Sequence, residues 1–295
     1  MSTSCHPPEP CVVAIIKGGL GNQLFAYAGA RAFALRTGRR LFIDDDSGFQ
    51  LDGYGRRFRL DQFPIVATPA PGALKLGNPK ALRHRWTRGI DRFRSANQRR
   101  YFAERKGILA TDLLEFQSRS SVVYLNGYWQ DPACFEDCAP EIRTELEPPL
   151  FQDPDDQALE KELASSDSIF VHVRRVRYSP LLDESYYETA IQRALEAIPS
   201  ASFEFFGDDL AWARDHLNLR GLPVRYHEGS SMDELRDFRL MAACRHAIVA
   251  NSSFSWWAAW LRDSAEKHVW TPSNPGWPVQ ASDSWHPVPN QLVTG

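Results

Sequence analysis

The chain has 295 residues, of which 43% are hydrophobic and 24% charged, and its formal net charge at pH 7 is −3. This length suits two domains of roughly 150 residues each, and the small negative charge argues against nucleic acid as a partner. No apolar run approaches the roughly 18 residues of a membrane span, and the first ten residues lack the pattern of a signal peptide. We therefore expect a cytoplasmic protein whose five cysteines are reduced thiols.

A strand, a glycine turn and a helix are predicted at the start of the chain. Residues 12–16 form a short apolar run typical of a buried strand, and residues 24–37 form a helix that Gly38 ends. Backbone N–H groups of a glycine turn can approach a phosphate or a sugar, although a purely structural connection is the default. The turn between strand and helix contains Gly18, Gly19, Gly21, Asn22 and Gln23.

A second strand, residues 40–43, ends in Asp44, Asp45 and Asp46. An acid about twenty residues after a glycine turn is one feature of a dinucleotide-binding fold, which would make the protein an oxidoreductase. The same pattern requires a small residue where Leu24 stands. The acids therefore fit this alternative and the leucine does not.

Two acidic segments also have the Asp-x-Asp spacing with which metal-dependent transferases hold a divalent ion on a donor diphosphate. One is residues 44–46 and the other is residues 153–155. We interpret the first as the end of a strand and the second as linker.

Residues 75–106 are strongly basic: eleven Lys and Arg stand against two acids, a balance of +9, so the remainder of the chain carries −12. Within this segment Leu82, Trp86, Ile90 and Phe93 recur at helical spacing. We expect a surface helix whose apolar stripe packs on its own domain, which is the commoner case. The alternative is peripheral contact with an anionic membrane, with the arginines at lipid phosphates.

The Pro-rich, acidic stretch 147–156 divides the chain into domains 1–150 and 151–295. After it, strands and helices alternate, which predicts a parallel, doubly wound sheet with ligands at the carboxyl ends of its strands. The predicted strands are residues 169–173, 203–206, 224–227, 247–250 and 268–271. Two predicted helices are residues 183–198 and 209–217. A third is opened by a capping box at residues 231–234 and runs to Cys244, and the last is a Trp-rich run through 256–261.

Polar residues that suit a phosphate follow two of these strands. Arg174 and Arg175 come directly after the first strand, and paired guanidinium groups present forked donors that match phosphate oxygens. Asn251, Ser252 and Ser253 stand between a later strand and the Trp-rich helix, where N–H groups and the helix dipole favour an anion. Together they predict an anion site at the strand ends.

Five motifs, spread over nearly the whole chain, resemble in order and spacing the bacterial α-1,2-fucosyltransferases of glycosyltransferase family 11. They are residues 18–28 (GGLGNQLFAYA), 127–130 (GYWQ), 172–175 (HVRR), 206–209 (FGDD) and 251–257 (NSSFSWW). The resemblance implies an α/β fold of GT-B architecture, with two Rossmann-like domains facing across a cleft. It also implies a GDP-L-fucose donor, a galactose-containing glycan as acceptor, inversion at the fucose anomeric carbon, and no metal or other cofactor.

Roles for individual residues follow from the motifs and their chemistry. Arg174 is our principal catalytic residue, and the resemblance places Asn22 beside it at the diphosphate or the fucose. Asp208 or Asp209 is expected to accept from guanine or ribose, and His172 either meets the nucleotide or fills a core position. The expected donor-binding set is Gly19, Gly21, Asn22, Gln23, His172, Arg174, Arg175, Asp208, Asp209, Asn251, Ser252, Ser253 and Phe254.

One departure from the family pattern bears on the mechanism. The family continues from the paired arginines into Gly-Asp-Tyr, whereas this chain has Val176, Arg177 and Tyr178. The missing acid cannot serve as a base for the acceptor hydroxyl. We therefore assign no general base.

Overall fold

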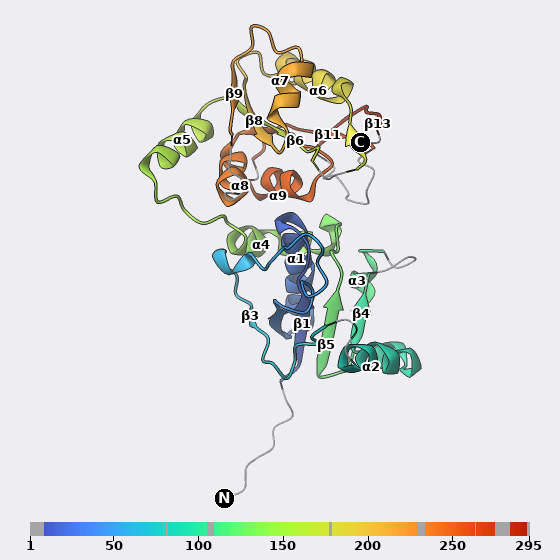
Figure 1. Ribbon diagram of the computed structural model, residues 1–295. Helices are drawn as coiled ribbons and strands as arrows, with labels where there is room; N and C mark the ends of the chain where they lie inside the picture. Colours follow the sequence, from blue (N-terminus) through green and yellow to red (C-terminus); the bar gives the residue numbers. More distant parts are fainter. Residues whose placement is uncertain are drawn as a thin grey trace, which may run out of the picture. The chain divides into compact units, whose positions relative to one another are not determined.

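The computed structural model describes residues 9–78, 80, 82–104, 109–176, 179–228, 234–262, 264–274 and 284–293. The chain divides into two compact units, Met1–Leu146 and Glu147–Gly295. The division falls at the start of the Pro-rich stretch, four residues before the expected boundary at 150. Each unit is a parallel sheet with helices packed on it (Figure 1).

Unit 1, residues 1–146, contains a sheet with the strand order β3-β2-β1-β5-β4, in which every neighbouring pair is parallel. The strands are β1 (Cys11–Ile15), β2 (Arg40–Asp44), β3 (Thr68–Pro69), β4 (Tyr101–Ala103) and β5 (Val122–Asn126). The helices are α1 (Leu20–Thr37), α2 (Leu82–Ile90), α3 (Asp112–Glu115) and α4 (Ala139–Glu145). Short 3₁₀ turns are Leu60–Gln62, Asp91–Phe93, Ala96–Gln98, Pro132–Cys134 and Glu136–Cys138.

Helix α1 is buried along most of its length. Its Tyr27 Oη donates to Glu145 of α4 at 2.5 Å, and Arg31 Nε donates to the same carboxylate at 2.9 Å. The helix begins at Leu20, four residues earlier than predicted, because the extended Gly19 is its N-cap. Asn22 therefore lies in the first helical turn and not at the tip of a glycine loop.

Unit 2, residues 147–295, contains the sheet β12-β11-β10-β6-β8-β9, again with only parallel neighbours. Its strands are β6 (Ser168–Val173), β8 (Ser202–Gly207), β9 (Val224–Tyr226), β10 (His246–Ile248), β11 (Val269–Pro272) and β12 (His286–Val288). A separate antiparallel pair joins β7 (Leu181–Leu182) to β13 (Leu292–Val293). The helices are α5 (Pro154–Ser165), α6 (Glu184–Ala197), α7 (Leu210–His216), α8 (Glu234–Ala243) and α9 (Ser253–Leu261).

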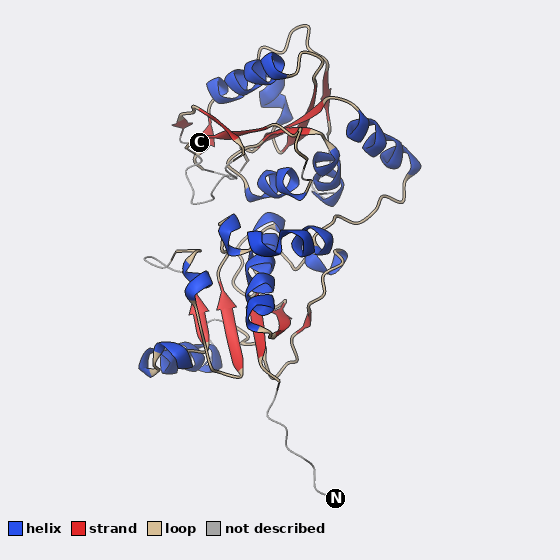
Figure 2. Cartoon of the chain, turned by 180° about the vertical axis from the view of Figure 1, so that it is seen from behind, coloured by secondary structure: helices blue, strands red, loops and turns tan. Residues whose placement is uncertain are grey.

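The unit 2 sheet is covered on both faces, with α6 and α7 on one side and α8 and α9 on the other (Figures 1 and 2). Its central strands supply the core: Ile169 and Val171 of β6 and Phe203 and Phe205 of β8 are fully buried. Each strand predicted in this half is present, with ends within two residues of the expected ones. The predicted doubly wound parallel fold is confirmed. The start of the predicted capping box, residues 231–233, lies outside the described residues.

Two expectations about surface segments are wrong. Helix α5 begins inside the stretch interpreted as linker, because Asp153 caps it by accepting from Asp155 N at 2.8 Å. The apolar stripe of α2 does not pack on unit 1: Trp86 is 64% exposed and Phe93 is 93% exposed. None of the described helices combines the length and apolar character that crossing a membrane demands.

Candidate functional site

The loop after β6 gives its two arginines different surroundings. Arg174 Nη1 donates to the Asp208 carboxylate, and 36% of the Arg174 side chain remains exposed. The Arg175 guanidinium instead lies 3.9 Å from the centre of the Trp212 ring, and its Nε is 3.9 Å from Asp209 Oδ2. Arg174 is therefore the more accessible cation, whereas Arg175 is held against α7.

Asp208 organises this loop. Besides Arg174, its carboxylate accepts from the backbone N–H groups of Arg175 at 2.7 Å and Val176 at 3.2 Å. Its own N–H donates to Val173 O at 3.2 Å, so the ends of β6 and β8 are joined. A carboxylate that accepts from one guanidinium and two amides fixes where the guanidinium points.

Asp208 and Asp209, both expected to accept from guanine or ribose, make hydrogen bonds within unit 2. Asp208 positions the arginine loop, and Asp209 is the N-cap of α7, accepting from Trp212 N at 3.1 Å. Arg177, the departure from the family pattern, lies outside the described residues.

The start of α9 differs in detail from the prediction. Ser252 is the N-cap, but its side chain makes no capping hydrogen bond and its N–H donates to Ala250 O at 2.8 Å. Asn251 is buried and its Nδ2 donates to Pro180 O at 2.7 Å, which ties this turn to the end of the arginine loop. The expected phosphate donor at Ser252 N is thus engaged within the turn. The dipole of α9 still favours an anion at this end of the helix.

His172 joins these two segments. It is 5% exposed near the end of β6, and its ring centre lies 5.8 Å from that of Phe254 in α9. Burial, with a smaller effect of Arg174, lowers the pKa of His172 to about 3, so the ring is neutral at pH 7. Its buried Nδ1 has no hydrogen-bond partner among the residues that the structure describes. An unpaired buried polar atom costs about 1 to 3 kcal/mol, a cost that a bound polar ligand would remove.

Gln23 of unit 1, expected to contact the donor, makes hydrogen bonds within its own unit. It is 1% exposed, and its Nε2 donates to Gly18 O at 2.9 Å and to Arg57 O at 2.8 Å. Its Oε1 accepts from Arg59 N at 3.0 Å, so the amide holds the loop 57–59 against the glycine turn.

The glycine turn and Asn22 are placed beside the GYWQ motif. Asn22 Oδ1 accepts from Gln130 Nε2 at 2.9 Å. Gly18 has φ of +80°, and a Cβ there would lie 3.0 Å from Asn22 Nδ2 and 3.1 Å from Tyr128 Oη. Gly19 is the extended N-cap, and Gly21 is buried in the first turn of α1. The motifs 18–28 and 127–130, distant in sequence, therefore form one cluster within unit 1.

Three polar residues of this cluster were not predicted as site residues from the sequence: Lys17, Glu104 and Asn126. Lys17 Nζ donates to Asn126 Oδ1 at 2.7 Å and lies 5.0 Å from the centre of the Tyr128 ring. Burial lowers the pKa of Lys17, with Glu104 opposing the effect. Glu104 Oε2 accepts from Tyr128 N at 2.6 Å. The only available signal was that Lys17 directly precedes the glycine turn.

The acids weighed as a ribose or metal site are engaged in local structure. Asp44 is buried and accepts from Ser47 N at 2.9 Å and Leu76 N at 3.0 Å. Asp45 pairs with Lys75, and Asp46 accepts from Gln50. Within the described ranges, no group of three His, Cys, Asp or Glu side chains is arranged to hold a metal ion.

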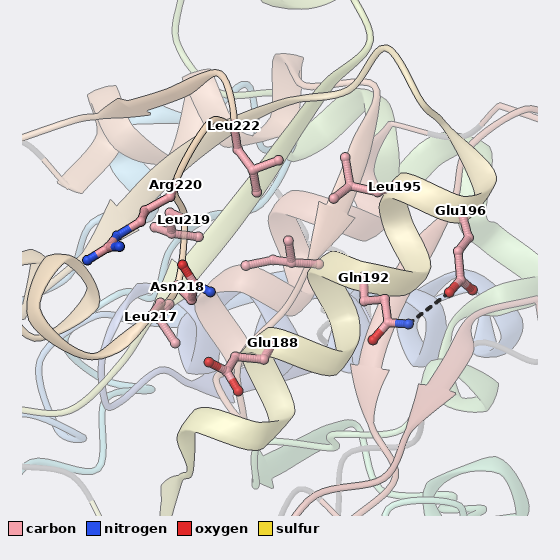
Figure 3. A pocket seen from close by; sticks show the side chains of 10 residues that line it. Glu188, Gln192, Leu195, Glu196, Leu217, Asn218, Leu219, Arg220 and Leu222 are labelled. Atoms are coloured by element: carbon pink, nitrogen blue, oxygen red, sulfur yellow. Dashed lines mark hydrogen bonds between the residues drawn. The ribbon is translucent and has the colours of Figure 1, made fainter.

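Described residues of unit 2 line two hollows that bear on the site. One of about 580 Å³ lies between α6 and the connection from α7 to β9, with Glu188 and Gln192 on one side and Leu219 on the other (Figure 3). None of the expected donor-binding residues lines it. A second, of about 370 Å³, is lined by Arg175 and Trp212 and adjoins the arginine loop. The candidate site is therefore defined by the strand ends and not by the hollow in Figure 3.

Comparison with known proteins shows what this chain is similar to. The family model described as glycosyl transferase family 11 matches residues 92–278. An α-1,2-colitosyltransferase of Escherichia coli is 28% identical, over 96% of this chain and 98% of its own length. An O-antigen biosynthesis glycosyltransferase of the same organism, WbnK, is 27% identical over 87% of this chain and 92% of its own length.

Solved structures show the same fold. The α-1,6-fucosyltransferase NodZ, soaked with GDP-fucose, superposes with a TM-score of 0.51 at 19% identity, over 86% of this chain and 92% of that one. A mutant of FUT1 of Arabidopsis thaliana, in complex with GDP, gives a TM-score of 0.53 at 13% identity, over 92% of this chain and 73% of that one. The fold is GT-B, with parallel α/β units as predicted. With its family model matched over residues 92–278, the chain belongs to glycosyl transferase family 11.

Proposed function

We propose that the protein transfers L-fucose from GDP-fucose to the 2-hydroxyl of a galactoside, with inversion and without a metal. The observation that carries the proposal is the group formed by Arg174, the buried His172 and the start of α9 at the strand ends of unit 2. The names of the relatives support a deoxyhexose as the transferred sugar and an O-antigen glycan as the acceptor.

The charges of the group fit the departure of a nucleoside diphosphate. Cleavage of the bond to the sugar develops positive charge on the ring and negative charge on the leaving diphosphate. Arg174 would receive the negative charge through forked hydrogen bonds, each worth about 1.5 to 3 kcal/mol. Asp208 would hold the guanidinium in position before the reaction, which lowers the cost of reorganisation. The proton of the acceptor hydroxyl would pass to solvent or to a phosphate oxygen.

Transfer of colitose is the second candidate, and the colitosyltransferase that aligns with 96% of this chain favours it. Colitose is a deoxysugar that lacks a hydroxyl group present in fucose. A site that hydrogen-bonds this hydroxyl strongly rejects the sugar without it, whereas an apolar site does not. The ratio of kcat/KM for the two GDP-sugars, measured with one galactoside, therefore decides between the candidates, and a ratio in favour of colitose would replace fucose as the donor sugar.

Transfer is expected to survive removal of divalent metal, because an arginine is proposed to receive the charge that a metal would otherwise hold. After dialysis against a chelator, kcat/KM for fucose transfer should stay within about twofold of its initial value, with the linkage of the product assigned by NMR. Loss of activity that manganese or magnesium restores would contradict the proposal. A known metal-dependent transferase, treated in parallel, shows that chelation was complete.

We also propose that the protein acts in the cytoplasm, as a peripheral protein at the inner face of the membrane. An acceptor glycan that is assembled on a membrane-bound carrier would require this location. The relative named for O-antigen biosynthesis supports such an acceptor.

A further inference from the structure

Helix α2 and the 3₁₀ turn after it are fixed to unit 1 by polar side chains. His84 is 2% exposed, and its Nε2 lies 3.3 Å from Tyr101 Oη at the start of β4. Asp91 is 7% exposed and accepts from the backbone N–H groups of Arg100 at 2.8 Å and Tyr101 at 2.5 Å. These bonds determine which side of the helix faces the protein.

The large apolar side chains lie on the other side. Leu82, Trp86, Ile90 and Phe93 are 71%, 64%, 43% and 93% exposed. Steps of three and four residues place them on one face of the helix and its continuation. An ordinary surface helix has the opposite arrangement, with its apolar stripe inward. A contiguous exposed apolar surface of this kind marks an interaction site.

The surroundings of this face are cationic. Lys80, Arg85, Arg99 and Arg100 are exposed, and Arg85 lines a shallow hollow of about 450 Å³ together with the apolar residues. The segment 75–106 has a balance of +9 in a chain whose net charge is −3. A partner that covers this face must therefore bury aromatic and aliphatic side chains and carry negative charge opposite the basic residues.

An anionic lipid bilayer meets both requirements. Its acyl boundary receives tryptophan, phenylalanine and leucine, and its phosphate groups pair with arginine. The nine residues of α2 are too few to cross a bilayer, so the helix would lie in the plane of the headgroups. We propose that the α2 face, which we define as Leu82, Arg85, Trp86, Ile90 and Phe93, docks this protein on an anionic membrane surface.

This inference names the surface that would hold the protein at the membrane. It rests on the proposed function only in that a membrane-bound acceptor glycan explains why the enzyme would be there.

The test sediments the full chain with vesicles of phosphatidylcholine alone or mixed with phosphatidylglycerol, at low and physiological salt. Binding should require the anionic lipid and weaken as salt is raised. Trp86 fluorescence should shift to the blue on binding, and Trp86→Phe should keep the binding and lose that shift. Sedimentation that is equal with the two lipid compositions would overturn the proposal.

Variants locate the contact on α2. Replacing both Trp86 and Phe93 by serine should lower the affinity for anionic vesicles at least about tenfold, because the inserted side chains are lost. The matched control is Leu150→Ser, which removes an apolar side chain that is 71% exposed in unit 2 and should leave binding unchanged. An equal loss in control and double variant would contradict docking through α2.

Two further measurements separate the alternatives. If the parent is a dimer in sedimentation velocity and the double variant is a monomer, the face is an interface between copies and the proposal is wrong. Transfer to a soluble galactoside should be the same in parent and double variant, because neither residue belongs to the candidate site. Vesicle binding without transfer would reject the proposed reaction alone, and transfer without vesicle binding would reject the docking alone.

Discussion

Replacing Arg174 by lysine is expected to lower kcat/KM for sugar transfer by at least about a hundredfold, or about 2.7 kcal/mol of transition-state stabilisation. Lysine keeps the positive charge but loses the planar fork that binds two oxygens at once. In the parent, Asp208 accepts from one guanidinium nitrogen of Arg174, and 36% of the side chain remains exposed to a ligand. Lysine has no second nitrogen that could bind a ligand while the first binds Asp208. Initial rates with GDP-fucose and a galactoside acceptor measure the effect.

Arg214→Lys is the matched control for this substitution. Arg214 also lies in unit 2, is 40% exposed and pairs with a carboxylate, that of Glu228 at 2.5 Å, but it belongs to no part of the candidate site. Its replacement should change kcat/KM less than about twofold, because an exposed ion pair contributes little. If Arg174→Lys stays within about threefold of the parent, Arg174 has no part in the reaction.

Gly207→Ala should destabilise unit 2 by about 2 to 5 kcal/mol, because the position combines backbone strain with a steric clash. Gly207 has φ of +149°, and a Cβ there would lie 2.0 Å from Val173 O on the neighbouring strand. This conformation ends β8 and turns the chain toward Asp208, so the same change should displace Arg174. Urea denaturation followed by the fluorescence of the buried Trp256 and Trp257 measures the loss.

Gly221→Ala separates strain from clash in the same unit. Gly221 also has positive φ, +80°, but nothing lies within 4 Å of the position of its added Cβ. Its cost should therefore be limited to the left-handed conformation, about 1 to 2 kcal/mol. Equal unfolding midpoints for the two variants would show that the contact with Val173 O is relieved at no cost.

The regular elements could be predicted from local patterns. Runs such as residues 169–173 and 203–206 are apolar, short and bounded by polar residues, and both became central strands. Alternation with helices then indicated a parallel sheet and located Arg174 and Asp208 at the strand ends. The start of α5 had a comparable signal, Asp153 before a proline, but the high proline content of the surrounding stretch favoured a linker.

The partners of the polar side chains could not be predicted, because they depend on residues far along the chain. Gln23 bonds to the backbone of Arg57 and Arg59, and nothing near Gln23 in sequence indicates this. The periodicity of α2 correctly predicted which residues form its apolar stripe. It did not predict whether this stripe faces the protein or the solvent. That choice is made by His84 and Asp91, two polar residues whose partners lie on β4 or directly before it.

The central claim is that unit 2 binds a guanosine diphosphate sugar through Arg174 and the start of α9. Isothermal titration calorimetry of the full chain with GDP, GDP-fucose and NAD, without added metal, tests it most directly. GDP and GDP-fucose should release or absorb heat in a saturable titration, and NAD should give no such signal. Binding of NAD without binding of GDP would contradict the account and would favour an oxidoreductase instead.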